Sequence, residues 1–261
     1  MIYRSEDIIC RWLCSSGSKG NATFIELDGK KLLIDAGISA RRIRQELEGI
    51  GQRVEELDGV FITHEHGDHI SGLVTLTKKY GVQVYSRPET FRAMSCYREL
   101  PIECINPIID RVRLDRVTVR AFDIPHDAAN PVGYVVQGSS RCVVATDMGF
   151  VDSSLQEMLE GARVMVLETN HDVEMLKNGS YPYSLKKRIL GARGHLSNRD
   201  AALAVAGLRQ RPRKLLLAHL SESNNRPELA RETVQAVFSQ QGINDVELYL
   251  TDQNQCTCVQ L

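Results

Sequence analysis

The sequence predicts an α/β protein built from two mixed β-sheets with helices on their outer faces. Short apolar runs rich in β-branched residues alternate with amphipathic stretches along the whole 261-residue chain. Tight turns such as residues 28–30 (DGK) join the early runs, which favours antiparallel pairs. Helices separate the later runs, which favours parallel pairs. No repeat or linker composition divides the sequence, so we expect one domain over residues 1–261.

The elements follow from hydrophobic periodicity, taken in chain order. Runs of five to seven mostly apolar residues indicate strands at residues 8–13, 22–27, 31–35, 59–63, 82–86, 117–123, 133–137, 142–147, 164–168, 214–219 and 246–250. Apolar positions at helical spacing indicate helices at residues 40–48, 70–80, 89–95, 153–159, 173–177, 184–190, 198–209 and 228–240.

Composition excludes some partners. The formal net charge is -1, so overall charge does not attract the chain to nucleic acid or to a membrane surface. Local basic clusters at residues 41–44, 186–188 and 209–214 are either solvated helix faces or contacts for phosphate. No apolar run is long enough to span a membrane, and the first residues lack a signal-peptide core. Seven cysteines without a CxxC pair indicate reduced thiols, so we expect a cytoplasmic protein.

The strongest chemical signal is the segment VFITHEHGDHI, residues 60–70. His64, His66, Asp68 and His69 follow an expected strand and precede an expected helix. Imidazole and carboxylate groups hold zinc, iron or manganese while leaving room for water. Three histidines within six residues are rare in a merely polar loop, so the segment predicts a metal site.

Three further candidates each end an expected strand: His126, Asp147 and His219. Taken singly, each is as consistent with a core or turn residue as with a ligand. Open α/β sheets place their ligand sites at the carboxyl ends of strands, so together they extend the same site.

These residues divide into two groups, one for each of two divalent ions. One ion is expected on His64, His66 and His126. The other is expected on Asp68, His69 and His219, with Asp147 bridging the two. Such a site accepts zinc, manganese, iron or nickel, since histidine and aspartate sites follow metal availability as much as affinity.

Two histidines remain outside this set. His195 lies just before a helix start, where Ser197 suits the N-cap and Asp200 follows three residues later. The free N–H groups of such a helix end can also face a phosphate. His195 is therefore either a structural residue at a helix end or a catalytic acid, and we favour the acid. His171 either contacts substrate or supports the site from behind, with Glu168 as its expected partner.

The sequence resembles the metallo-β-lactamase superfamily. LLIDAG with Asp35, HEHGDH, and then His126, Asp147 and His219 match its successive motifs. SGSKGNA, PHDAANPVGY, ETNHDVEMLKNGSYPYSLKKRIL, GHLSN and LAHLSESNN are similar to the YycJ/WalJ branch. The resemblance implies an αββα sandwich with a dinuclear site at one edge. It also implies that Asp35 is buried and orients a ligand histidine.

The expected chemistry is hydrolysis of a phosphodiester. Two ions a few ångströms apart lower the pKa of a bridging water toward about 7, and the resulting hydroxide attacks the phosphate. Asp68 would bind metal and hold this nucleophile in line, and His195 would protonate the leaving oxygen. The same site also suits a small phosphodiester or a thioester, and a non-catalytic metal-dependent interaction protein is a third alternative.

The resemblance implies DNA as the substrate, degraded from the 5′ end. We expect His171, His195, Ser197 and Asn225 to contact it. Asn225 belongs to a loop, residues 221–226, whose composition suits either a terminal phosphate or a simple turn.

Overall fold

The computed structural model describes residues 14–15, 20–251 and 257–260. Its first sheet has six strands, in the order β1-β2-β3-β4-β5-β6. These are β1 (Cys14–Ser15), β2 (Ala22–Leu27), β3 (Lys30–Ile34), β4 (Gly59–Phe61), β5 (Val84–Ser86) and β6 (Ile105–Pro107). β1, β2 and β3 pair antiparallel, and the pairs from β3 to β6 are parallel.

The second sheet has seven strands, in the order β13-β12-β11-β10-β9-β8-β7. They are β7 (Arg111–Leu114), β8 (Val117–Asp123), β9 (Val132–Gln137), β10 (Arg141–Ala145), β11 (Val164–Glu168), β12 (Lys214–Ala218) and β13 (Glu247–Leu250). The pairs from β7 to β10 are antiparallel, and those from β10 to β13 are parallel.

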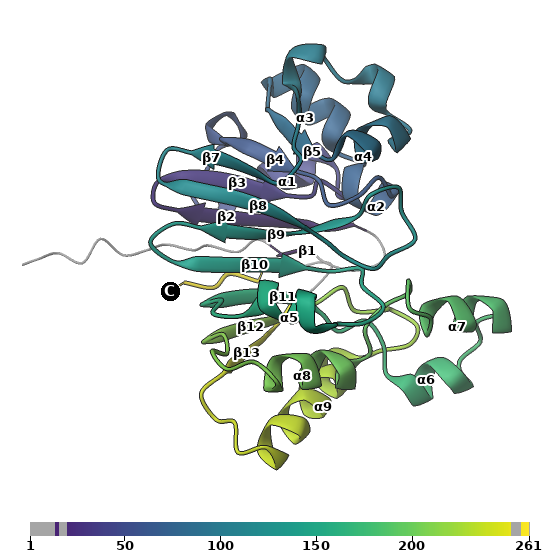
Figure 1. Cartoon of the computed structure of the whole chain (residues 1–261). Coiled ribbons are helices and arrows are strands. Elements are labelled where there is room, and N and C mark those ends of the chain that lie inside the picture. The colour runs from purple at the N-terminus through teal and green to yellow at the C-terminus, as the bar shows by residue number, and fades with distance from the viewer. Residues whose placement is uncertain (1–13, 16–19, 252–256, 261) are drawn as a thin grey trace, which may run out of the picture.

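Helices cover the outer face of each sheet (Figure 1). Those of the first half are α1 (Ala40–Gly49), α2 (Gly67–Ile70), α3 (Leu73–Tyr80) and α4 (Pro88–Ala93). Short 3₁₀ turns lie at Val54–Glu56, Tyr97–Glu99 and Ile102–Cys104. Those of the second half are α5 (Ser153–Leu159), α6 (Val173–Asn178), α7 (Tyr183–Ile189), α8 (Asn198–Ala206) and α9 (Pro227–Gln240).

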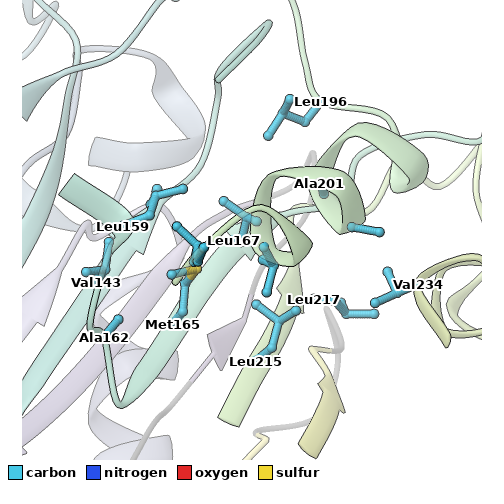
Figure 2. Close-up of a cluster of buried hydrophobic side chains, with 14 of the residues drawn as sticks. Val143, Leu159, Ala162, Met165, Leu167, Leu196, Ala201, Leu215, Leu217 and Val234 are labelled. Atoms are coloured by element: carbon cyan, nitrogen blue, oxygen red, sulfur yellow. The ribbon is translucent and has the colours of Figure 1, made fainter. Parts of the chain in front are cut away.

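The core has three layers because both faces of each sheet are covered. Alternate residues of β11 face opposite layers: Val164 and Val166 pack between the sheets, whereas Met165 and Leu167 pack beneath α5, α8 and α9. Figure 2 shows the second of these layers, where Leu215 and other side chains of the sheet meet the helices. A third cluster joins α1, α3 and α4 to the first sheet. This arrangement confirms the predicted αββα sandwich.

Several expected elements differ in detail. The expected helix over residues 70–80 is interrupted at Gly72, where a Cβ would lie 2.4 Å from the carbonyl oxygen of Ile38. The Gly72 N–H instead donates to the oxygen of Ala36 at 2.8 Å. β6 and β7 were not expected, since three-residue and half-exposed strands carry little periodic signal. The strand expected at residues 8–13 lies outside the described residues.

Among the residues that the structure describes, we find no helix with the length and apolarity needed to cross a bilayer.

Candidate metal centre

The candidate metal ligands come together at one edge of the sandwich. His64 and α2 follow β4, and the loops after β8, β10 and β12 carry the other three residues, His126, Asp147 and His219. Because these loops leave strands of both sheets at the same edge of the sandwich, residues up to 155 positions apart in sequence meet there. α2, α6 and α7 lie at this end of the strands, on the right of Figure 1.

Glycine at position 37 lets the loop after β3 pack directly on α2. A Cβ on Gly37 would lie 1.6 Å from the carbonyl oxygen of Asp68, so no other residue fits without moving the backbone. The same carbonyl accepts a hydrogen bond of 2.8 Å from the N–H of Asn21. Contacts from the first sheet thus fix the backbone that carries Asp68 and His69.

Asp35, Asp147 and His219 adopt the left-handed backbone conformation, with φ of 62°, 60° and 56°. Non-glycine residues rarely do so, although aspartate and histidine tolerate it better than most. Asp35 and His219 directly follow β3 and β12, and Asp147 comes two residues after the end of β10. Backbone strain of this kind is typical of functional sites, where the surrounding structure imposes the geometry.

Four groups of potential ligands form within the site. Two are trios expected from the sequence, and the other two are His64 with His69 and Asp147, and Asp147 with Glu168, His195 and His219. In each trio, one donor atom from every residue lies within 4.8 Å of the others; the trios are His64, His66 and His126, and Asp68, His69 and His219. Asp147 lies between them, with Oδ2 3.4 Å from Nε2 of His69 and Oδ1 3.9 Å from Nε2 of His126. The trios coincide with the division expected from the sequence; metal binding by them stays a prediction.

The chemistry of these donors fits divalent ions. Nδ1 of His126 and Oδ2 of Asp147 are buried and have no hydrogen-bond partner among the described residues. The Nε2 atom of His64 lies only 2.9 Å from Nδ1 of His66. Burial, followed by the neighbouring imidazoles, lowers the pKa of His64 well below its ordinary value. Neutral imidazole and unpaired carboxylate oxygens are the form in which these groups bind metal.

Asp35 orients one candidate ligand, His69, as the resemblance implies. Its Oδ2 accepts a hydrogen bond from Nδ1 of His69 at 2.8 Å, while its Oδ1 accepts one from the Thr63 N–H, also at 2.8 Å. Since a carboxylate only accepts, this bond puts a proton of His69 on Nδ1, while Nε2 lies 3.0 Å from the side-chain nitrogen of Asn21 and 3.4 Å from Oδ2 of Asp147. Burial alone would lower the pKa of His69, but Asp35 and then Asp147 raise it to about 9.

Glu168, at the end of β11 in the second sheet, also orients imidazole rings by accepting their Nδ1–H bonds. The sequence did not predict this role. Oε1 of Glu168 accepts hydrogen bonds from Nδ1 of His195 and from Nδ1 of His219, both at 2.7 Å. Its Oε2 accepts from the backbone N–H groups of Met148 at 2.9 Å and Leu196 at 3.0 Å. One fully buried carboxylate therefore orients a candidate ligand and the candidate acid together.

These contacts shift the pKa values of Glu168 and His195 in opposite directions. Burial alone would raise the pKa of Glu168, but the His195 charge and bond, followed by those of His219, hold that pKa below its ordinary value. Burial alone would lower the pKa of His195, but the charge and hydrogen bond of Glu168 raise it above its ordinary value. His195 can therefore carry a proton near neutral pH, as an acid must.

A cavity of about 270 Å³ opens at this edge. It is lined on one side by Asp68, Asp147 and His195, and on the other by Tyr181 and Arg188 of the α7 region. Nε of Arg188 donates to Oδ2 of Asp127 at 2.6 Å, which ties α7 to the loop that carries His126.

The remaining predicted contacts lie behind this cavity. The hydroxyl of Ser197 caps α8 by accepting from the Asp200 N–H at 3.1 Å and donating to the Asp200 carboxylate at 2.7 Å, which confirms the helix start. The amide of buried Asn225 donates to the carbonyls of Thr169 and Asn170. Neither residue is among the cavity-lining residues, and substrate contact by them stays a prediction.

His171 is buried, with both ring nitrogens unpartnered among the described residues. Among the described residues no hydrogen bond joins it to its expected partner Glu168, whose carboxylate accepts from four other groups. Burial lowers the pKa of His171, and the charge of Glu168 opposes this only in part. Its backbone carbonyl accepts the N–H of Asn198 at 2.9 Å, so it supports the start of α8.

Comparison with known proteins identifies the family to which this chain belongs. The β-lactamase superfamily domain matches residues 30–220. The chain belongs to the metallo-β-lactamase superfamily. Its superfamily, together with curated relatives that are exodeoxyribonucleases, makes it a hydrolase.

Two curated relatives in this superfamily match nearly the whole chain. Exodeoxyribonuclease YycJ of Bacillus anthracis is 37% identical over 254 residues, which cover 94% of this chain and 96% of YycJ. Exodeoxyribonuclease WalJ of Streptococcus pneumoniae D39 is 36% identical over 94% of this chain and 95% of WalJ.

A solved structure shares the fold. YhfI of Bacillus subtilis, a metallo-β-lactamase fold protein, aligns with a TM-score of 0.70 at 18% identity, covering 96% of this chain and 98% of its own. At this identity the likeness supports the fold alone.

Proposed function

We propose that the protein is a metal-dependent exodeoxyribonuclease that degrades DNA from the 5′ end by hydrolysing phosphodiester bonds. DNA is proposed as the substrate because nearly the whole chain matches the exodeoxyribonucleases YycJ and WalJ. The arrangement of the site supports the reaction type, as the following residues show.

Two divalent ions would be held by the His64, His66 and His126 trio and by the Asp68, His69 and His219 trio, with Asp147 between them. When bound, such ions would activate water as a nucleophile and neutralise the charge of the phosphate.

The chain's own groups would orient the reaction and move its proton. Asp68 lines the cavity, and its pKa lies below the ordinary value: burial opposes this, but the hydrogen bond and charge of His219 and the charge of His69 outweigh it. An ionised Asp68 can accept a hydrogen bond from the attacking water and hold it in line. His195 donates Nδ1–H to Glu168, which leaves Nε2 to carry the proton for the departing oxygen.

Hydrolysis of duplex DNA labelled at one end tests this proposal. Chelator-treated protein is expected to be inactive, and added manganese or zinc should restore the release of mononucleotides. Loss of a 5′ label in the earliest products is expected, whereas early loss of a 3′ label would reverse the direction. Protein that hydrolyses bis(p-nitrophenyl) phosphate or a thioester but releases no nucleotide would point to a small-molecule hydrolase instead.

A further inference from the structure

Two further hollows, of about 470 and 440 Å³, lie near the candidate metal site. The first shares the lining residue His126 with the cavity of the site and is also lined by Phe150 and Arg193. Phe150 also lines the other hollow, so its ring stands between two open spaces. A path therefore leads from the metal ligands to an aromatic ring and a guanidinium group.

Three loops that carry this path pack closely against one another beside the site. The N–H of Gly149 donates to the carbonyl of Pro125 at 3.1 Å. A Cβ on Gly149 would lie 2.4 Å from the carbonyl group of Ala192, so only glycine allows this approach. Phe150 and Arg193 are the next residues after Gly149 and Ala192. Their backbone positions are thus fixed against the loop that carries His126.

The exposed ring of Phe150 has no packing role that explains it. It is 42% exposed and lies outside the three buried clusters, although its neighbours Met148 and Val151 pack in or against one of them. Exposed aromatic rings beside a basic groove are the usual platform on which successive bases stack.

Arg193 supplies a positive charge on the same path. It is exposed, and no hydrogen bond or ion pair joins it to another residue in the described part of the chain. By contrast, Arg188 on the other side of the site is bonded to Asp127. Asp123, which also borders the hollow, is paired with Arg87 at 3.0 Å, so its charge is offset.

We propose that Phe150 and Arg193 form a binding site for the DNA strand that continues from the scissile phosphate. Phe150 stacks on an unpaired base, and Arg193 pairs with a backbone phosphate. The site therefore favours a strand that is single-stranded for at least a few nucleotides beyond the reacting bond. This inference rests on the proposed function and extends it from the reaction to the form of the substrate.

Substrate length provides the test. Steady-state kinetics would compare a dinucleotide with a single strand of about ten nucleotides, which is long enough to reach the hollow. For Phe150→Ala we expect KM to rise about tenfold more for the long strand than for the dinucleotide, because only the long strand loses stacking. Phe150→Tyr should restore the wild-type ratio. Ile102→Ala is the matched control, since Ile102 is 77% exposed and lines none of the hollows.

Salt dependence tests the arginine. Arg193→Gln should reduce the slope of log KM against log salt for the long strand by about 0.7, the loss of one phosphate contact to a single strand. Arg98→Gln, at an exposed position in the Tyr97–Glu99 turn, should leave the slope as it is.

The outcomes separate this inference from the proposal beneath it. Wild-type protein that degrades DNA, with Phe150→Ala and Arg193→Gln indistinguishable from their controls, would overturn the binding site alone. Wild-type protein that releases no nucleotide would overturn the proposed function and this site with it.

Discussion

The two sheets each place one buried carboxylate behind the candidate metal site, and the two differ in what they hold. Asp35, from the first sheet, bonds the single imidazole of His69 and is fixed by Thr63. Glu168, from the second sheet, bonds both His219 and His195. In the proposed reaction, the first carboxylate would therefore support metal binding alone, whereas the second would join metal binding to proton transfer.

Replacing Glu168 should have the largest effect, because two imidazoles lose their anionic partner. Glu168→Gln is expected to weaken metal affinity by about 10–100-fold. It should also lower turnover by about 10²–10⁴-fold with saturating metal, since His195 is misplaced and less basic. Metal titration and single-turnover hydrolysis of DNA measure the two effects separately. Combination with His195→Ala should be far from additive; additive losses would show that Glu168 does not act through His195.

Replacing His195 should lower turnover but leave metal affinity unchanged. His195→Ala is expected to lower turnover by about 10²–10⁴-fold, the usual contribution of a general acid, while bound metal is retained. Elemental analysis of the purified variant measures the retained metal, with His64→Ala as the variant expected to lose it. Loss of metal from His195→Ala would make this residue a ligand.

Replacing Asp35 should show the opposite pattern. In Asp35→Asn, His69 loses a charged hydrogen bond, so metal affinity should fall by about 10–100-fold. Because no bond joins Asp35 to His195 among the described contacts, excess metal should restore most of the turnover. Turnover that stays low at saturating metal would show that Asp35 does more than orient a ligand.

The smallest expected effect is on the pH profile of turnover. There the two carboxylate variants should differ in the position of the alkaline limb. The pKa of His195 is raised by Glu168, so its acid form is present at low pH and is lost as pH rises through that raised value. The alkaline limb of turnover against pH should therefore lie above the ordinary histidine pKa of about 6.5. In Glu168→Gln, measured at saturating metal, this limb should move to lower pH, and it should stay in place in Asp35→Asn. A limb unmoved by Glu168→Gln would belong to another group.

The sequence by itself determined the sandwich and the positions of the ligand candidates. Apolar runs of strand length define where each strand ends, and His126, Asp147 and His219 stand at those ends. The HEHGDH segment is local, so its spacing alone predicts a cluster. The start of α8 is local too, because Ser197 caps a helix whose first turn follows it directly.

Tertiary structure decided which partner each of these residues has. Glu168 reads as the last residue of an apolar strand, and its two imidazole partners lie 27 and 51 residues away. Sequence spacing assigned it to nearby His171, but strand pairing brings β12 beside β11 and so places His219 within reach. The path along Phe150 and Arg193 likewise exists only because Gly149 packs against Ala192. Local patterns follow from periodicity and backbone preference, whereas contacts between distant loops depend on how the sheets align, and no single stretch of sequence encodes that.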